Sequence, residues 1–293
     1  MKNYIGLFYF SGTGNTRLIA NLIQKQLKSK SIAVDVLSIE ELTNKDLQIN
    51  FDKYDMVGIG YPIYGFGEPR IIEKFVLMLP NVMCKKVFIF KTAADFISIN
   101  NNASRYLIKK LHSKGYDVFY DRVICMGSNF LASYDDELVK QLYLSALYKV
   151  ENFCEDVLSG RKRMYKSTWF LILVTRTVHW FEDKWFARMF GRSLKTSDKC
   201  NNCGKCVRNC PARNIYSKNN KIRFKWNCFL CMRCIYSCPE KAITSRGFKA
   251  FILKDGYDIN RIIKNQHIKG EYITNDTKGF MKHFNSYFDD VSI

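Results

Sequence analysis

Two runs of four cysteines near the C-terminus constrain this chain more than any other feature. The eight residues are Cys200, Cys203, Cys206 and Cys210, followed by Cys228, Cys231, Cys234 and Cys238. Each run reads C-x2-C-x2-C-x3-C-P, and the closing prolines are Pro211 and Pro239. This spacing is typical of chains that hold [4Fe–4S] clusters through cysteine thiolates, so two runs predict two clusters.

Zinc is the main alternative to iron and sulfide at these cysteines, because structural zinc sites also use C-x2-C pairs. Such zinc sites use two pairs of cysteines that are usually well separated in the sequence. They do not require the x3-C-P ending that both runs share. Secreted disulfides are a weaker alternative, since no signal peptide is recognisable and the N-terminus leads straight into a strand-like run. We therefore expect two clusters, and thiolate ligands in turn predict a reducing cytoplasm.

The region around the two runs, about residues 195–246, resembles the two-cluster bacterial ferredoxins. In those proteins the fourth cysteine of each run binds the cluster of the other run. For this chain, the resemblance implies one cluster on Cys200, Cys203, Cys206 and Cys238. It implies a second cluster on Cys228, Cys231, Cys234 and Cys210.

The N-terminus carries the second strong signal. A short apolar run over 3–10 predicts a buried strand, and a helical pattern occupies 17–27. A strand, a loop of small residues and a helix N-terminus together favour phosphate binding, because loop N–H groups and the positive helix end face an anion. The loop matches neither Walker A nor G-x-G-x-x-G, and an ordinary strand–helix turn is the alternative. It consists of Ser11, Gly12, Thr13, Gly14, Asn15 and Thr16.

The loop sequence SGTGNT resembles the phosphate loop of the flavodoxins, which follows [ST]-x-T-G-x-T. Strands alternating with helices indicate a doubly wound parallel α/β sheet. The resemblance implies five strands in the order 2-1-3-4-5, with FMN beyond their carboxyl ends. The later strand-like runs lie at 32–39, 55–60, 86–92 and 118–126, with helical stretches near 69–79, 101–114 and 135–158.

Two further loops are candidate contacts for the flavin ring. The loop after the third strand contains Tyr61, Pro62, Ile63, Tyr64 and Gly65, and we expect Tyr61 or Tyr64 to stack on the ring. An ordinary Gly/Pro loop with core tyrosines is the alternative. The loop after the fourth strand departs from the flavodoxin pattern, because it lacks the glycines often found there. Its residues are Thr92, Ala93, Ala94 and Asp95. No set of residues stands out as a catalytic acid, base or nucleophile.

Positive charge is concentrated in the second half of the chain. Residues 161–192 carry eight Lys/Arg and two Asp/Glu, and residues 193–246 carry twelve and two. Such a surface attracts acidic proteins, so it predicts an acidic redox partner, such as a ferredoxin, a flavodoxin or an oxidoreductase. Nucleic acid is disfavoured because no nucleic-acid-binding motif is present.

We expect four regions along the chain. They are a flavodoxin-like FMN domain (1–160), a basic aromatic linker (161–194), a small α+β two-cluster ferredoxin-like domain (195–246) and a tail packing on both domains (247–293). The apolar run at 169–174 in the linker is far shorter than the roughly 20 residues that span a bilayer. The interpretation that we favour is one or two linker helices packed between the domains. A lid over the flavin edge and a contact of 161–192 with an anionic membrane surface stay open.

The arrangement as a whole resembles the fused flavodoxin–ferredoxin proteins of anaerobes. It implies an electron carrier that relays electrons between FMN, two [4Fe–4S] clusters and redox proteins. One alternative is a flavin-dependent reductase of a small acceptor, such as a quinone or a nitro compound. Another is a non-redox sensor or binding protein with structural clusters. The remaining cysteines, Cys84, Cys125 and Cys154, lie in apolar contexts and are expected to be buried.

Overall fold

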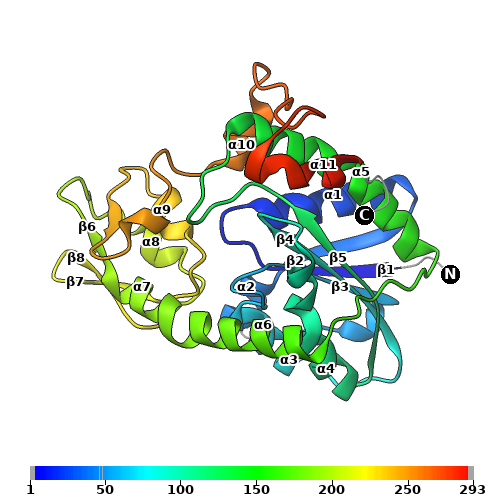
Figure 1. The fold of residues 1–293 in the computed structure, drawn as a ribbon. Coiled ribbons are helices and arrows are strands. Elements are labelled where there is room, and N and C mark those ends of the chain that lie inside the picture. Colours follow the sequence, from blue (N-terminus) through cyan, green and yellow to red (C-terminus); the bar gives the residue numbers. More distant parts are fainter. Residues whose placement is uncertain (1–3, 46, 48, 290–293) are drawn as a thin grey trace.

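A five-stranded parallel sheet with helices on both faces forms the larger part of the molecule (Figure 1). The computed structural model describes residues 4–45, 47 and 49–289, so Asn3 of the first predicted strand lies outside the described residues. The strand order is β2-β1-β3-β4-β5, which confirms the predicted flavodoxin-like topology. The strands are β1 (Tyr4–Tyr9), β2 (Ala33–Ser38), β3 (Met56–Pro62), β4 (Lys85–Ala93) and β5 (Tyr116–Cys125).

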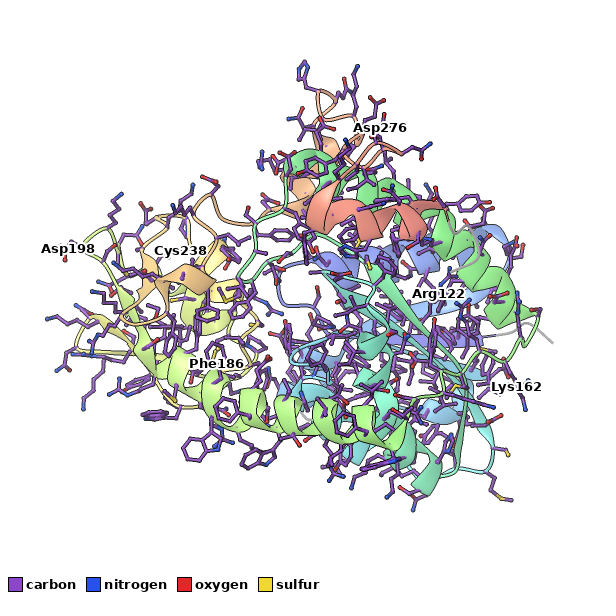
Figure 2. The ribbon with its side chains drawn as sticks, in the orientation of Figure 1. Arg122, Lys162, Phe186, Asp198, Cys238 and Asp276 are labelled. Carbon is purple, nitrogen blue, oxygen red and sulfur yellow. The ribbon has the colours of Figure 1, made fainter. Side chains whose placement is uncertain are left out.

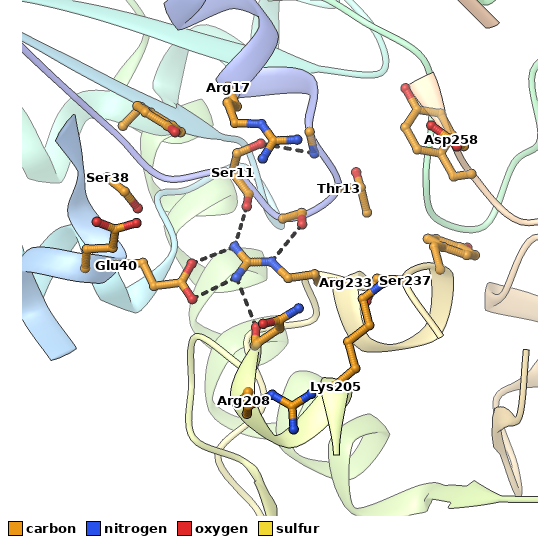
Figure 3. A pocket seen from close by; sticks show the side chains of 17 residues that line it. Ser11, Thr13, Arg17, Ser38, Glu40, Lys205, Arg208, Arg233, Ser237 and Asp258 are labelled. Atoms are coloured by element: carbon orange, nitrogen blue, oxygen red, sulfur yellow. Dashed lines mark hydrogen bonds and ion pairs between the residues drawn. The ribbon is translucent and has the colours of Figure 1, made fainter. Parts of the chain in front are cut away.

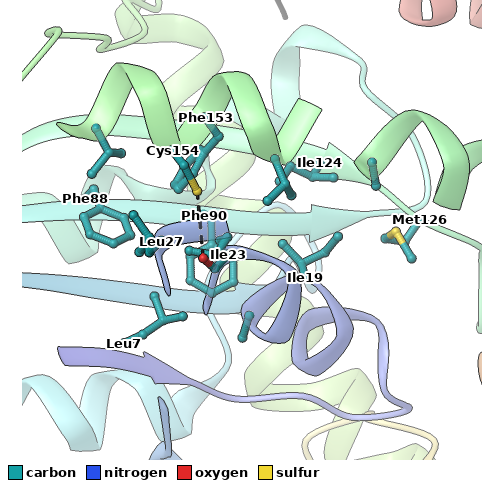
Figure 4. Close-up of a cluster of buried hydrophobic side chains, with 14 of the residues drawn as sticks. Leu7, Ile19, Ile23, Leu27, Phe88, Phe90, Ile124, Met126, Phe153 and Cys154 are labelled. Carbon is teal, nitrogen blue, oxygen red and sulfur yellow. Dashed lines mark hydrogen bonds between the residues drawn. The ribbon is translucent and has the colours of Figure 1, made fainter. Parts of the chain in front are cut away.

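The central strands are covered on both faces, which explains why their sequences are continuous apolar runs rather than alternating ones. On one face, Leu7 and Phe90 pack beneath α1 (Asn15–Ser29) and α5 (Asp136–Leu158) (Figure 4). The other face lies beneath three helices, α2 (Ile39–Lys45), α3 (Arg70–Met78) and α4 (Arg105–Ser113), with the short turns η1 (Phe51–Lys53) and η2 (Ser98–Ser104) nearby.

Two of the three cysteines outside the runs are buried as predicted. Cys154 lies in the core between α5 and the sheet, and Cys125 lies in a smaller apolar cluster at the end of β5. The prediction was wrong for Cys84, which is exposed. It precedes β4 in a turn with a backbone φ of 58°, outside the apolar strand that suggested burial.

The two cysteine runs lie in a small module of short elements, on the left in Figure 1. β6 (Leu194–Thr196) pairs antiparallel with β9 (Ile243–Ser245), and β7 (Ile215–Lys218) pairs antiparallel with β8 (Lys221–Phe224). One short helix follows the start of each cysteine run. These helices are α8 (Lys205–Arg208) and α9 (Arg233–Tyr236).

A continuous helical segment connects the two parts along one side of the molecule (Figure 1). It consists of α6 (Trp169–Phe181), η3 (Glu182–Phe186) and α7 (Ala187–Ser193), and η3 is one turn of π-helix. The segment begins after Thr168, whose hydroxyl accepts a hydrogen bond from the N–H of Leu171 at 3.4 Å. Within the described residues, no helix has the length and apolar character needed to cross a bilayer.

The C-terminal tail packs mainly on the sheet domain. The Tyr287 hydroxyl accepts a hydrogen bond from the N–H of Cys125 at 3.0 Å, which anchors the last helix to β5. Ile259 and Ile262 join the apolar core beneath α1 and α5. The tail elements are η4 (Lys249–Phe251), α10 (Ile259–Lys264), η5 (Gly279–His283) and α11 (Phe284–Asp289).

Candidate functional site

A cavity of about 200 Å³ lies at the carboxyl ends of the parallel strands, where ligands of doubly wound sheets bind. All three predicted loops contribute to it. The lining includes Ser11, Gly12, Thr13, Asn15, Thr16, Pro62, Ile63, Tyr64, Gly65, Thr92, Ala93 and Ala94. Gly14 lines a neighbouring cavity instead. Asp95 is absent from the lining of both cavities, and its carboxylate lies 3.0 Å from Nε2 of His283.

The two candidate stacking tyrosines are placed very differently. Tyr61 is fully buried in the sheet core, and its hydroxyl donates to the carbonyl of Ala103 at 3.2 Å. Tyr61 is therefore a core residue, as the alternative interpretation of this loop allowed. Tyr64 lies beyond the end of β3 and lines the cavity. Its buried hydroxyl has no hydrogen-bond partner among the described residues, which leaves a donor for a ligand.

The N-terminus of α1 is suited to a phosphate group. α1 begins at Asn15, has no side-chain cap and carries no acidic residue in its first turn, so its N–H groups are free to face an anion. Ser11 Oγ accepts a hydrogen bond from the N–H of Gly14 at 3.2 Å. Thr16 Oγ1 lies 2.7 Å from Thr92 Oγ1, which joins the phosphate loop to the loop after β4.

Four residues outside the three predicted loops also belong to this site. Glu182, from the π-helical turn η3, lines the cavity, and burial raises the pKa of its carboxyl group to about 7. Leu230 and Asn129 line the cavity too, and the Asn129 amide donates to Thr13 Oγ1 at 2.5 Å. Tyr257 donates to Asn15 Oδ1 at 2.6 Å from the tail. A π-helical turn often marks a functional site, but its sequence carried no signal.

The thiols of the two runs are grouped as crossed ligation requires. Cys200, Cys203, Cys206 and Cys238 line one small cavity of about 20 Å³. In the second group, burial first and then the neighbouring thiols of Cys231 and Cys210 together raise the pKa of Cys228 to about 12. We name the first group the distal set and the second group, Cys210, Cys228, Cys231 and Cys234, the proximal set. Among the described residues, no three His, Cys, Asp or Glu side chains are grouped as ligands of a single metal ion would be.

Backbone N–H groups point at the sulfurs, as suits thiolate ligands. Asn214 donates to Cys210 Sγ at 3.3 Å, and Leu230 donates to Cys228 Sγ at 3.3 Å. Ala242 donates to Cys238 Sγ at 3.4 Å. Hydrogen bonds to the sulfurs stabilise negative charge and are one of the protein's means of setting a cluster's potential.

The proximal set lies directly against the phosphate loop. A Cβ atom added to Gly12 would lie 2.6 Å from the Cys231 carbonyl oxygen and 3.1 Å from the Cys231 Cβ, so only glycine allows this approach. Arg233 joins the two surfaces. Its guanidinium donates to the carbonyls of Ser11 at 2.6 Å and Gly12 at 3.0 Å, and pairs with Glu40 at 2.6 Å (Figure 3).

Comparisons with known proteins agree with this geometry. A flavodoxin domain model matches residues 6–119, and a 4Fe-4S dicluster domain model matches residues 193–250. This chain is a fusion of a flavodoxin domain and a 4Fe-4S dicluster domain. The flavodoxin domain implies FMN, and the dicluster domain implies two iron–sulfur clusters.

Individual flavodoxins are similar to part of this chain. The chain is 42% identical to a flavodoxin of Synechocystis over 64 residues, or 22% of this chain and 35% of the relative. It is 43% identical to flavodoxin 1 of Escherichia coli K12 over 65 residues, which are 22% of this chain and 34% of the relative. The match thus spans about a third of these relatives. Oxidised flavodoxin 2 of Bacillus cereus aligns with 53% of this chain and 98% of its own, at 23% identity and a TM-score of 0.39.

We predict that the phosphate loop distinguishes FMN from riboflavin. Replacing both Thr13 and Thr16 by alanine should weaken FMN binding by about a hundredfold or more, because hydrogen bonds to a charged group contribute roughly 1.5–3 kcal/mol each. Riboflavin binding should change much less, since riboflavin has no phosphate. Fluorescence titration of the flavin-free protein measures both affinities, with Thr277→Ala as a remote control. Equal losses for the two ligands would contradict the placement of the phosphate.

We predict that Glu68, at the end of the loop after β3, makes stability depend on pH. Its carboxyl group is buried and burial raises its pKa to about 8, so the folded state holds a proton that the unfolded state has released above pH 4.5. Stability should therefore fall as pH rises from about 4.5 to 8. Glu68→Gln should remove roughly 2–5 kcal/mol of this fall, at about 1.4 kcal/mol per pKa unit. Denaturant midpoints at pH 5 and pH 9 test this, with the exposed Glu271→Gln as control. Parallel pH profiles for wild type and Glu68→Gln would show the prediction to be wrong.

Proposed function

We propose that this chain is an electron-transfer protein that passes single electrons between FMN and its two [4Fe–4S] clusters, and between the clusters and a redox partner. FMN exchanges one or two electrons and each cluster exchanges one, so the chain converts between paired and single electrons. The observation that carries the proposal is the contact of Cys231 with Gly12, together with Leu230 in the wall of the flavin cavity. These contacts support the proximal set as the direct neighbour of the flavin.

Arg233 has the role of holding the flavodoxin and dicluster domains in this arrangement. Besides Ser11, Gly12 and Glu40, its guanidinium donates to the Asn209 carbonyl at 3.0 Å, so every part of the guanidinium is engaged within the chain. Arg70 adds a second link, since it pairs with Asp183 of η3 at 2.7 Å and donates to the Cys228 carbonyl at 2.6 Å. Because these contacts fix the distance between the flavin site and the proximal set, the domains do not have to move for an electron to pass between them.

The proposed partner is an acidic redox protein that docks beside the distal set. Cys203 is exposed, and Lys205 and Arg208 lie next to it on α8. The Arg208 guanidinium donates to the Cys203 carbonyl at 3.1 Å and is still exposed, so a partner can reach it. Arg233, also beside a motif cysteine, is unsuited to this role because its ion pair with Glu40 lies inside the domain contact.

Anaerobic rapid mixing tests the relay. A reduced acidic ferredoxin is mixed with the oxidised holoprotein, and the absorbance of clusters and flavin is followed. Cluster reduction should precede flavin reduction. Arg208→Glu should slow the encounter roughly tenfold at low salt and change little at 1 M salt, where the Debye length is about 3 Å. Lys109→Glu, on the distant helix α4, is the charge-matched control.

Two outcomes would contradict the proposal. Flavin reduction at an unchanged rate after loss of the clusters would separate the flavin from the relay. Rapid steady-state turnover with a quinone or a nitro compound, without any protein partner, would favour a reductase of small acceptors.

A further inference from the structure

The helical segment between the two domains has one face whose large apolar side chains are mostly exposed. Six large apolar side chains on this segment are between 54 and 75% exposed. We call them the aromatic face, and they are Trp169, Phe170, Leu173, Trp180, Phe181 and Trp185. Side chains of this size normally supply the energy of a core or an interface, and a contiguous exposed group of them marks an interaction site.

The opposite side of the same segment is held firmly against the flavodoxin domain. Thr175 is buried, and His179 Nδ1 lies 3.0 Å from the Tyr64 carbonyl oxygen. Glu182 reaches the flavin cavity, and Asp183 pairs with Arg70. Because these contacts fix the rotation of the segment, the aromatic face cannot turn inward without breaking them. Figure 2 shows the segment along the edge of the molecule, with Phe186 on it.

The charges around the aromatic face are positive. Residues 161–192 carry eight Lys/Arg, and their only acids are Glu182 and Asp183. Both acids point inward, Glu182 into the flavin cavity and Asp183 to Arg70, so the outward charges of the segment are cationic. Exposed cations lie within it at Arg176, Lys184 and Arg192, and Lys184 Nζ also lies 3.7 Å from Asp183 Oδ2.

Basic and aromatic surface continues onto the dicluster domain. Arg192 lines a surface hollow together with residues of the hairpin β7–β8 and its flank. That hollow also contains Trp226, which is 58% exposed, and three further cations. Those cations are Lys218, Arg223 and Lys225.

We propose that the aromatic face binds the surface of an anionic membrane. Tryptophan and phenylalanine are the side chains that enter the boundary between headgroups and acyl chains, and lysine and arginine beside them pair with anionic headgroups. Each cation near such a surface strengthens the attraction to it. A helix presented on the outside of the molecule, with cations and no outward acid, matches a flat anionic surface in both shape and charge.

Membrane binding by the aromatic face does not depend on the electron relay. It also places the flavin near the membrane, because the segment that carries the aromatic face outward carries Glu182 into the flavin cavity. A redox protein bound in this way exchanges electrons at the membrane surface without spanning it.

Vesicle co-sedimentation of the holoprotein tests the proposal. Vesicles of phosphatidylcholine alone are compared with vesicles that contain phosphatidylglycerol. Binding should require the anionic lipid, and tryptophan fluorescence should shift to shorter wavelength as the rings leave water. The triple variant Trp169→Ser/Trp180→Ser/Trp185→Ser should lower the partition coefficient roughly tenfold or more, with flavin and cluster absorbance unchanged.

Matched variants locate the binding surface. Phe181→Ser should weaken binding, whereas Phe280→Ser should not, although Phe280 is 79% exposed and Phe181 only 59%. Arg176→Glu/Lys184→Glu should weaken binding more than Lys109→Glu/Lys110→Glu on α4. Failure to bind anionic vesicles overturns the proposal. So does a dimer in sedimentation velocity that the triple variant abolishes, because the face would then be an interface between two copies of the chain.

Discussion

Replacing Cys210 by serine should remove the cluster beside the flavin and leave the other cluster in place. Iron content should fall from about eight to about four per chain, since each [4Fe–4S] cluster holds four iron atoms. The physical reason is the grouping of thiols, in which Cys210 contributes to the surroundings of Cys228, Cys231 and Cys234. Cys238 lines the cavity of the other three cysteines.

Double variants make this prediction sharp. Cys210→Ser/Cys231→Ser should still hold about four iron atoms, because both changes affect one cluster. Cys210→Ser/Cys203→Ser should hold almost none, because the changes affect different clusters. Uncrossed ligation predicts the reverse of both results. Iron and sulfide analysis after anaerobic reconstitution gives the counts, and Cys84→Ser, at an exposed cysteine outside the runs, should keep all eight iron atoms.

The loss of Cys210 has a further expected consequence for the flavin. With the proximal cluster gone, reduction of the flavin through the distal cluster should slow far more than in Cys238→Ser, which keeps the proximal cluster. Rapid mixing with a reduced protein donor measures both rates. Similar rates in the two single variants would mean that the proximal set does not lie on the electron path.

Replacing Lys91 by methionine should destabilise the flavodoxin domain by about 3–5 kcal/mol. Lys91 of β4 pairs with Asp121 of β5 at 2.8 Å, and the side chains are 0% and 3% exposed. Lys91 also donates to Ser104 Oγ at 2.9 Å. Removing the ammonium group leaves a buried carboxylate without its counter-charge, and the desolvation of that carboxylate is no longer offset.

The control for Lys91 is an ion pair at the surface. Lys30→Met breaks the pair with Glu155, whose atoms are 3.1 Å apart and whose side chains are 33% and 57% exposed, so it should cost less than about 1 kcal/mol. Lys91→Met/Asp121→Leu should recover much of the lost stability, because no buried charge remains. Denaturant unfolding measures all three variants. A loss below about 1 kcal/mol for Lys91→Met would refute this account.

Much of the fold could be predicted from the sequence because its signals are local. A parallel strand covered on both faces needs an apolar run, so the five runs predicted five strands close to their observed bounds. Cysteine spacing is equally local, since three ligands of one cluster come from a single turn of chain. The phosphate loop combined a strand, small residues and a helix start within a few positions, and these elements lie where the pattern placed them.

The flavin ring contacts were only partly predictable. β3 extends to Pro62, beyond the expected end at Gly60, so Tyr61 is still a strand residue whose side chain points into the core. Tyr64, after the strand end, faces the cavity. Successive side chains of a strand point to opposite faces of the sheet. A small error in the predicted end of a strand therefore decides whether a residue such as Tyr61 is assigned to the core or to the flavin site.

The sequence by itself was enough to identify the two cofactor motifs and the uneven distribution of charge. Its resemblance to the flavodoxins was enough to predict the strand order. Only the tertiary structure decided how the two domains meet. Arg233 reaches Glu40 across 193 positions of sequence, and Cys231 lies against Gly12. The tertiary structure also places Glu182 in the lining of the flavin cavity and Trp169 at the exposed surface. These outcomes depend on which surfaces pack together in space, whereas spacing along the chain records only what neighbouring residues do.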